Sequence, residues 1–528
     1  MKQLFTFLLV AIPICLHGQD NLVITSPNTS IPGAYNTVIG INAGNIGITG
    51  QNNVATGYYA GNGLTSGSDN TFLGNSAGIR TTVGKDNTYL GSGAGYINTS
   101  GSRNLFGGAY AGFNSTTGNE NTFLGSASGT NNKTGSRNTF VGMNSGYATM
   151  SGVQNVSLGF QSSYNNINGN GNTHIGTLAG GYNQSGSFNV MVGDSAGLNN
   201  TQSGNVFVGS KSGYTNTSGA NNVFVGLLAG NANTIAFGNT FVGAYAGRAN
   251  AIGNSNSFFG ASAGEQNTGG GNSFFGNHAG SSNTTGNQNT FIGASSGFLN
   301  NEGKANIFIG SSAGFYNTTG SNNIIIGPNA GNTITDGTDN VLIGYNSQAE
   351  DGLHNATAIG SGSHVAISNA LILGNQANVG IGTSAPTTSL HVKSSQANES
   401  GVRLEQLTTS SPTSRSTDQF LTVDENGNVV KARYQLRINN PSEWSDKVFT
   451  PGYQLRTLTD VSSYIAQHGH LPGVPSAQQV TKEGIDLIKM NATLLEKVEE
   501  LTLYLLEQQK VNKEMKAQIE ELKRLMKR

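Results

Sequence analysis

Asn70-Thr-Phe-Leu-Gly74-Asn-Ser-Ala-Gly78 is the stretch that decides the fold, because the chain repeats it over residues 36–348. Self-similarity at a fixed period is typical of a solenoid, in which one turn buries its apolar side chains only against neighbouring turns. The glycines equivalent to Gly74 recur every 17 residues, with two steps of 16, at Gly40, Gly57, Gly91, Gly108, Gly125, Gly142, Gly159, Gly176, Gly193, Gly209, Gly226, Gly243, Gly260, Gly276, Gly293, Gly310, Gly327 and Gly344.

Each unit has the same order of residue types as the first stretch. An Asn such as Asn70 is followed by an aromatic such as Phe72, an aliphatic such as Leu73 and the glycine, and Ala77 and Gly78 mark the next turn. The short β-branched and aromatic run predicts one strand per turn, so neighbouring strands would be parallel. The Asn column would form a ladder of side-chain amides. Gly, Ser and Asn enrichment alone is typical of a disordered tract, but the strict phase favours a solenoid.

Two units near the end of the array carry a family resemblance. They read Asn355-Ala-Thr-Ala-Ile-Gly360 and Asn369-Ala-Leu-Ile-Leu-Gly374, and they are 14 residues apart. They resemble the head repeats of YadA-like trimeric autotransporter adhesins, and the 17-residue units resemble them more loosely. The resemblance implies a left-handed parallel β-roll and three chains around a common axis. In such a trimer we expect Leu73-type residues in the lumen and Phe72-type residues toward the neighbouring chains.

The chain divides into seven segments by composition and period. Residues 378–392 resemble a junction found in bacterial and phage fibre proteins, and Val402-Arg403-Leu404 and Phe420–Val423 predict a hairpin-rich neck. A short helix is expected near Leu458 to Gln467. The segments are a secretory signal peptide (1–18), an N-terminal lead (19–35), the 17-residue-repeat shaft (36–348), the 14-residue repeats and junction (349–392), a β-rich neck (393–440), a compact α/β segment (441–484) and a coiled coil (485–528).

The coiled coil is predicted from apolar residues that alternate steps of four and three. Asn491 is a polar residue in this seam, and such residues set register at a cost in stability. The pattern predicts association of copies of this chain without deciding between two and three strands. The seam contains Leu487, Asn491, Leu494, Val498, Leu501, Leu505, Gln508, Asn512, Met515, Ile519, Leu522 and Met526.

Charge and residue types argue against several functions. The net charge is −1, so the electrostatic case for nucleic acid is absent. We predict no catalytic, cofactor-binding or metal-binding residues, and no membrane span after signal cleavage. His468 and His470 flank Gly469 without an acidic or Cys cluster, which favours a turn over a metal site. Ser157 and His174 interrupt the aromatic column and are expected to mark local repacking.

The sequence therefore predicts a mainly β, non-enzymatic protein, secreted or at the cell surface, that forms a homotrimer and binds an unknown extracellular surface or matrix ligand. Two alternatives stay open. Ser445-Asp446-Lys447 is faintly similar to the start of the self-cleaving endosialidase-type chaperone domain of phage tail proteins, although the following helix of that domain is missing. Threonines such as Thr71 and Thr88 recur in phase, as in an ice- or crystal-binding solenoid, but Val and Leu share their column.

Overall fold

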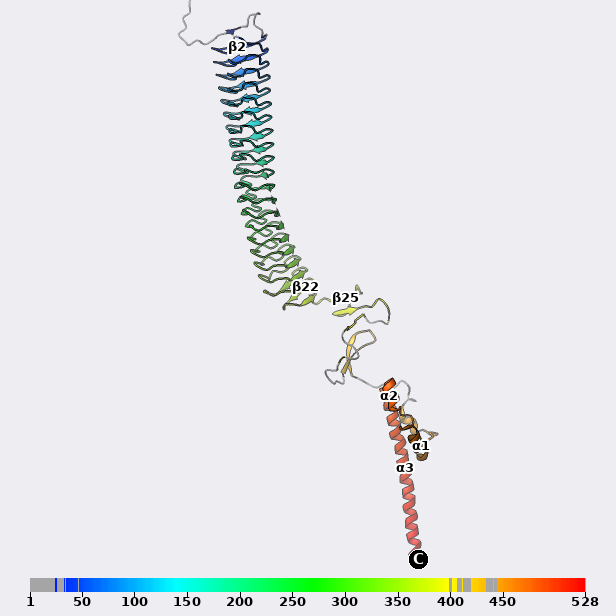
Figure 1. Ribbon diagram of the computed structural model, residues 1–528. Helices are drawn as coiled ribbons and strands as arrows, with labels where there is room; N and C mark the ends of the chain where they lie inside the picture. The colour runs from blue at the N-terminus through cyan, green and yellow to red at the C-terminus, as the bar shows by residue number, and fades with distance from the viewer. Residues whose placement is uncertain are drawn as a thin grey trace, which may run out of the picture. The chain divides into compact units, whose positions relative to one another are not determined.

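The computed structural model describes residues 24–25, 33, 35–45, 47–397, 401–405, 411, 419–433, 440 and 444–527. The chain forms two compact units, Met1–Val402 and Arg403–Arg528. Figure 1 shows the first unit as a stack of turns that each carry a short strand. The predicted signal peptide, residues 1–18, lies outside the described residues, and its cleavage stays a prediction.

A sheet of 22 strands runs along the first unit. From β2 onward, each strand pairs in parallel and in register with the strand of the next turn, so that Phe72 lies opposite Tyr89 and Phe224 opposite Phe241. The predicted parallel β-solenoid of about twenty turns is confirmed. At the start of the stack, β1 pairs antiparallel with β2 and covers its outer edge. The strands are β1 (Ile24–Thr25), β2 (Thr37–Ile39), β3 (Val54–Thr56), β4 (Thr71–Leu73), β5 (Thr88–Leu90), β6 (Leu105–Gly107), β7 (Thr122–Leu124), β8 (Thr139–Val141), β9 (Val156–Leu158), β10 (Thr173–Ile175), β11 (Val190–Val192), β12 (Val206–Val208), β13 (Val223–Val225), β14 (Thr240–Val242), β15 (Ser257–Phe259), β16 (Ser273–Phe275), β17 (Thr290–Ile292), β18 (Ile307–Ile309), β19 (Ile324–Ile326), β20 (Val341–Ile343), β22 (Thr357–Ile359) and β24 (Leu371–Leu373).

The first repeated glycine is required by the stacking of the turns. A Cβ atom on Gly74 would lie 2.5 Å from the carbonyl oxygen of Gly91, the equivalent residue one turn later. Gly74 also has φ +141°, which residues with a side chain rarely adopt. Because neighbouring strands are only about 4.8 Å apart, any side chain at this corner would force the turns apart.

The predicted orientation of the two apolar columns is wrong. Phe72 is 0% exposed, whereas Leu73 is 50% exposed. Successive strand residues point to opposite faces, so Asn70 and Phe72 share the inner face while Thr71 and Leu73 share the outer one. The lumen accommodates the larger ring because Gly78 carries no side chain: a Cβ atom there would lie 2.9 Å from the Phe72 ring.

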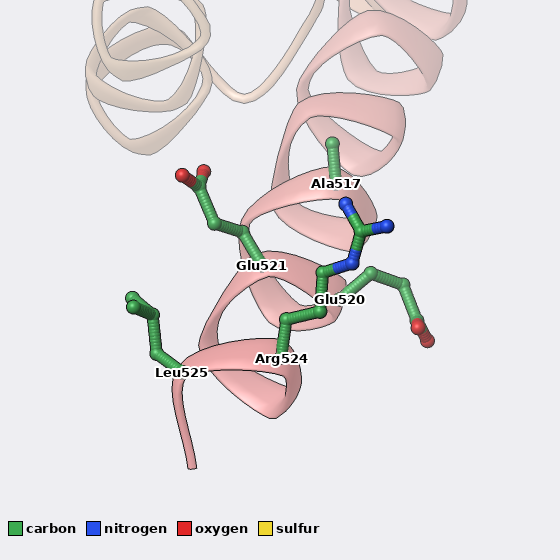
Figure 2. Close-up of a pocket in the computed structure, with 5 residues that line it drawn as sticks. All are labelled: Ala517, Glu520, Glu521, Arg524 and Leu525. Carbon is green, nitrogen blue, oxygen red and sulfur yellow. The ribbon is translucent and has the colours of Figure 1, made fainter. Parts of the chain in front are cut away.

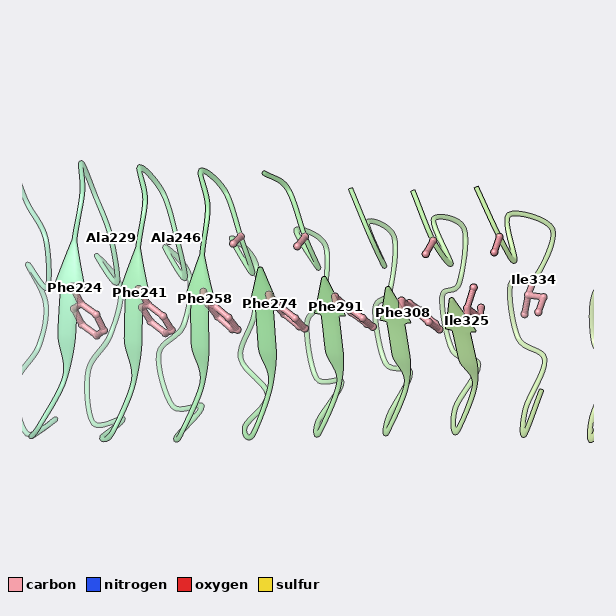
Figure 3. Close-up of a cluster of buried hydrophobic side chains, with 14 of the residues drawn as sticks. Phe224, Ala229, Phe241, Ala246, Phe258, Phe274, Phe291, Phe308, Ile325 and Ile334 are labelled. Atoms are coloured by element: carbon pink, nitrogen blue, oxygen red, sulfur yellow. The ribbon is translucent and has the colours of Figure 1, made fainter. Parts of the chain in front are cut away.

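The inner aromatic rings form continuous stacks. Figure 3 shows one of them running from Phe224 to Phe308, with Ile325 and Ile334 beyond. The centroids of Phe224 and Phe241 are 4.8 Å apart and their planes differ by 7°. This distance matches the spacing between neighbouring strands, so pairing the strands in register also places each ring on the next.

The predicted ladder of Asn side chains is present along the inner corner. The backbone N–H of Asn70 donates to Oδ1 of Asn53 at 3.0 Å, and Nδ2 of Asn70 donates to the carbonyl oxygen of Gly84 at 2.9 Å. Equivalent contacts continue to Asn340, whose N–H donates to Oδ1 of Asn323. Both polar ends of most of these amides are used, so the side chains are buried with their groups paired, whereas Nδ2 of Asn239 has no partner among the described residues.

A second buried Asn ladder was not predicted from the sequence. It occupies the position seven residues after the first glycine, and its hydrogen bonds run from Asn200 to Asn233 and again from Asn250 to Asn317. Nδ2 of Asn300 donates to Oδ1 of Asn283 at 2.5 Å, and Nδ2 of Asn317 donates to Oδ1 of Asn300 at 2.7 Å. Between residues 64 and 149 the same column contains Leu64, Thr81 and Ser115 as well as Asn, and this mixture hides the pattern.

The 14-residue units continue the first sheet. β22 pairs in parallel with β20 and with β24. Here β21 (Gln348–Ala349) and β23 (His364–Val365) form a second parallel pair, and Ala349 and Val365 are fully buried. A further parallel pair follows, β25 (Val379–Ile381) with β26 (Leu390–Val392).

The second unit contains a hairpin and several helices. β27 (Gln419–Val423) and β28 (Val429–Arg433) are antiparallel, so the predicted run Phe420–Val423 is part of a hairpin, whereas the run at residues 402–404 is not a strand. The helix predicted near Leu458 is α1 (Leu458–His468), which ends at Gly469 with φ 76°. The other helical elements are η2 (Ser445–Phe449), α2 (Ala477–Glu483) and α3 (Leu487–Leu525).

Candidate functional site: two exposed apolar surfaces

The outer face of the solenoid sheet carries an apolar strip. We define the outer strip as the first and third residues of β3–β20, β22 and β24. The third residues are aliphatic or aromatic, apart from Thr56 and Gly107, and the first are Thr, Ser, Val, Ile or Leu. Leu73, Leu90 and Ile292 are among the exposed members, and no charged residue belongs to the strip.

The size of the outer strip argues for a partner. About twenty strand spacings give a length of about 95 Å, and the two columns are roughly 7 Å apart, so the area is on the order of 700 Å². The largest apolar patch on a typical monomer covers about 300 to 600 Å², and a stable interface buries roughly 800 Å² on each partner. Half of the first residues are Thr or Ser, so the outer strip is not wholly apolar, but its total area is close to what one partner contributes to a stable interface.

Charged residues of the shaft lie at its corners and not on the outer strip. Arg103 Nη2 is 2.9 Å from Glu120 Oε1, and Arg137 Nε is 3.3 Å from Glu120 Oε2. Arg248 and Glu265 form a similar pair across one turn. Such exposed ion pairs contribute little to stability.

In the second unit, one side of α3 is covered by the segment that contains η2. Ser445 Oγ donates to Oε1 of Glu499 at 3.0 Å, and Lys447 Nζ is 2.9 Å from Oε2 of Glu496. Burial raises the pKa of Glu496, but the hydrogen bonds from Lys447 and Lys497 outweigh it, so the pKa lies below its ordinary value. Tyr504 lies near the same side, and its hydroxyl donates to the carbonyl oxygen of Arg456 at 2.5 Å.

The seam of α3 is left open by this arrangement. Glu496 and Glu499 occupy heptad positions away from the seam, whose Leu494, Leu501 and Leu505 are each exposed. Asn491, also in the seam, donates from Nδ2 to the carbonyl oxygen of Leu487 at 2.8 Å. The exposed apolar members are Leu487, Leu494, Val498, Leu501, Leu505, Met515, Ile519, Leu522 and Met526.

A hollow near the end of α3 offers no enclosed binding site. It is lined by Ala517, Glu520, Glu521, Arg524 and Leu525, and Figure 2 shows that all five project from the last turns of one helix. A surface made by one side of one helix encloses no ligand. Its two carboxylates and one guanidinium are typical of a solvated helix face.

The predicted repeat residues have different environments. Asn70, Phe72, Ala77 and Gly78 are buried inside the solenoid, and only Leu73 contributes to the outer strip. No group of three or more His, Cys, Asp or Glu side chains among the described residues could hold a metal ion. Within the same residues, the helices are too short or too polar to cross a membrane. Comparisons of the chain with family models, curated proteins and solved structures find no match.

Proposed function

We propose that this chain is a non-enzymatic, secreted or cell-surface fibrous protein that assembles as a homotrimer and serves as an adhesin. The observation that carries the proposal is the open seam of α3, because the chain covers the polar side of this helix and leaves its apolar heptad positions to another copy. The number three comes from the resemblance of the units at Asn355 and Asn369 to trimeric adhesin heads. The outer strip is then the surface through which neighbouring shafts pack.

Self-association through the seam is tested by charge substitution. Leu494→Asp with Leu501→Asp should replace the discrete trimer by mixed or aggregated oligomers, because carboxylates in the seam would be buried without partners while the outer strips can still pack without a fixed register. The matched control is Leu506→Asp with Ala517→Asp, which adds the same charge to exposed positions of α3 outside the seam. Multi-angle light scattering should give three chains for the natural protein and the control. A monomeric natural protein would refute the assembly.

Packing between shafts has a separate test. The one cysteine of the chain, Cys15, lies in the predicted signal peptide. Val225→Cys, on the outer strip, should therefore form disulfide-linked chains on mild oxidation, whereas Thr217→Cys, on a loop, should not. If the protein is trimeric but Val225→Cys forms no cross-link, the chains associate through α3 and the outer strip is not part of the interface.

Adhesion would use the repetitive polar loops, which multiply weak contacts over many turns and three chains. The partner is an extracellular surface or matrix ligand, and the loops offer hydroxyl and amide groups with few charges. Binding of the trimer to a glycan and matrix-protein array, with loss of binding in the Leu494→Asp, Leu501→Asp protein, is the expected result. If the array shows no binding while the trimer is intact, the protein is a structural fibre.

One contact favours self-cleavage as a second candidate. Ser445 and Glu499 are 1% and 9% exposed, and Oε2 of Glu499 has no hydrogen-bond partner among the described residues. Glu499 would accept the Ser445 hydroxyl proton while Oγ attacks the carbonyl carbon of Trp444. The C–N bond would break to give an ester and a free amine, and water would hydrolyse the ester to a Trp444 carboxylate.

Self-cleavage is tested by intact mass. The second candidate predicts a fragment that begins at Ser445, and Ser445→Ala should abolish it. Glu499→Gln should slow its formation, because an amide is a far weaker base than a carboxylate. A purified natural protein that contains only the full mature chain would exclude the reaction.

A further inference from the structure

The aromatic interior of the shaft is interrupted at one level. The buried apolar residues of the first unit form two groups, one ending at Phe140 and the other beginning at Ala179. Between them, β9 and β10 place Ser157 and His174 in the column that holds aromatic rings in most other turns. The interruption therefore separates two stretches of stacked rings inside an otherwise continuous sheet.

Three polar residues at this level form a linear chain of side-chain contacts, here called the polar joint. Oγ of Ser157 is 2.5 Å from Oγ of Ser163, which is 2.5 Å from Nδ1 of His174. All three residues are 0% exposed. The other ring nitrogen of His174, Nε2, is buried and has no hydrogen-bond partner among the residues that the structure describes.

The surroundings of His174 favour its neutral form. Ser157 and Met191 lie opposite it on β9 and β11, and Gly180 lies beside its ring. None of these groups is charged, and the buried polar residues described in the first unit are Asn, Ser, Thr and His174 itself. Burial lowers the pKa of His174 to about 3, since no carboxylate is present to compensate an imidazolium ion.

We propose that the polar joint is an acid-sensitive opening point, at which the shaft loses local structure on mild acidification while the stretches on either side stay folded. Stacked rings bind the turns together above and below it, whereas the side chains of Ser157, Ser163 and His174 are joined to one another by two contacts alone, and Nε2 of His174 has no partner among the described residues. Local opening is expected where buried apolar contacts are fewest. The inference does not depend on the number of chains in the assembly.

The direction of the pH effect follows from proton binding. In the opened segment His174 would titrate near 6.5, whereas in the closed shaft it stays neutral until far lower pH. The opened state therefore takes up a proton that the closed state does not, and acid favours opening. Between about pH 6 and pH 4 the equilibrium constant for opening should rise by up to about tenfold per pH unit.

Hydrogen exchange of the full chain, read by mass spectrometry, tests the joint. Protection factors, which correct for intrinsic exchange, should fall by about 10- to 100-fold for amides in residues 155–193 between about pH 7 and pH 4.5. Those in residues 88–124 and 240–292 should change little. His174→Phe should remove the response, because Gly180 leaves room for a ring as Gly78 does for Phe72.

Two further proteins make the test decisive. His278→Gln changes a histidine of the same shaft outside the joint and should keep the full acid response. Ser157→Phe with Ser163→Gly and His174→Phe restores the common residues at every position of the joint, and it should show no response even if the single variant folds poorly. An unchanged protection factor in the natural protein, or an equal fall in the His174 variants, would overturn the proposal.

Discussion

The Oγ atoms of Ser157 and Ser163 lie 2.5 Å apart because two substitutions occur together in one turn. Elsewhere the position of Ser157 usually holds a ring and that of Ser163 usually holds a glycine, as in Phe72 and Gly78. The ring occupies the space that a Cβ atom on the glycine would need. Once the ring is replaced by Ser157, that space admits the side chain of Ser163, although its φ of 54° remains unfavourable.

This coupling predicts that Ser157→Phe lowers the free energy of unfolding when residue 163 is Ser and raises it when residue 163 is Gly. In the His174→Phe background, Ser157→Phe alone should destabilise the shaft by about 1 to 3 kcal/mol, because the new ring meets the Ser163 side chain. Adding Ser163→Gly should reverse the effect and make the protein more stable than the background, since the ring then completes the stack. Urea unfolding measures both steps. Additive effects would contradict the coupling.

A second prediction separates two reasons why a position requires glycine, its positive φ and the lack of space for a Cβ atom. Gly247 and Gly238 have φ of 57° and 67°, but a Cβ atom on Gly247 would lie 2.4 Å from the Phe241 ring, whereas the nearest atom to one on Gly238 is 3.9 Å away. Gly238→Ala should cost about 1 to 2 kcal/mol from backbone conformation alone. Gly247→Ala should cost about 1 to 3 kcal/mol more, because the ring must move. Equal losses in urea unfolding would mean that the ring does not limit this site.

A third prediction concerns the first Asn ladder. Asn87→Ala removes the donor to the Gly101 carbonyl oxygen and the acceptor for the Asn104 N–H. The Asn104 N–H would be buried without a partner, while the Gly101 carbonyl oxygen would keep its bond from Nδ2 of Asn98, so the free energy of unfolding should fall by about 1 to 3 kcal/mol. Asn75→Ala, at an exposed position one turn earlier, is the control and should change stability by under about 0.5 kcal/mol. A similar loss of stability in both proteins would mean that the Asn ladder does not stabilise the shaft.

A fourth prediction concerns the contact between η2 and α3 at low pH. The pKa of Glu496 lies below its ordinary value of 4.5 in the folded protein. Its contact with Lys447 therefore stabilises the unit above about pH 4.5 and is lost as the pH falls further. The only tryptophan, Trp444, precedes η2, so its fluorescence should report this loosening. Lys447→Ala should make the fluorescence change on acidification smaller, while Lys523→Ala, which removes a largely exposed pair with Glu520, should leave it unchanged.

The sequence by itself determined the features that depend on period. A glycine every 17 residues, with Asn, an aromatic and an aliphatic residue in constant phase, requires turns of equal length, and turns of equal length pair their strands in register. The same regularity predicted the Asn53–Asn70 type of ladder, and the spacing from Leu487 to Met526 predicted the long helix α3. These features depend only on contacts between neighbouring turns or neighbouring helical residues. A repeated sequence specifies those contacts through its period.

Only the tertiary structure decided which side of each strand is inside. Phe72 and Leu73 are both apolar, so alternation allows either to face the lumen. The choice depends on the space beside Gly78 and on the hydrogen bonds that hold Asn70, which shares a face with Phe72. The pairing of Ser157 with Ser163, and the cover that Ser445 and Lys447 provide for the polar side of α3, likewise depend on contacts between positions that no period connects.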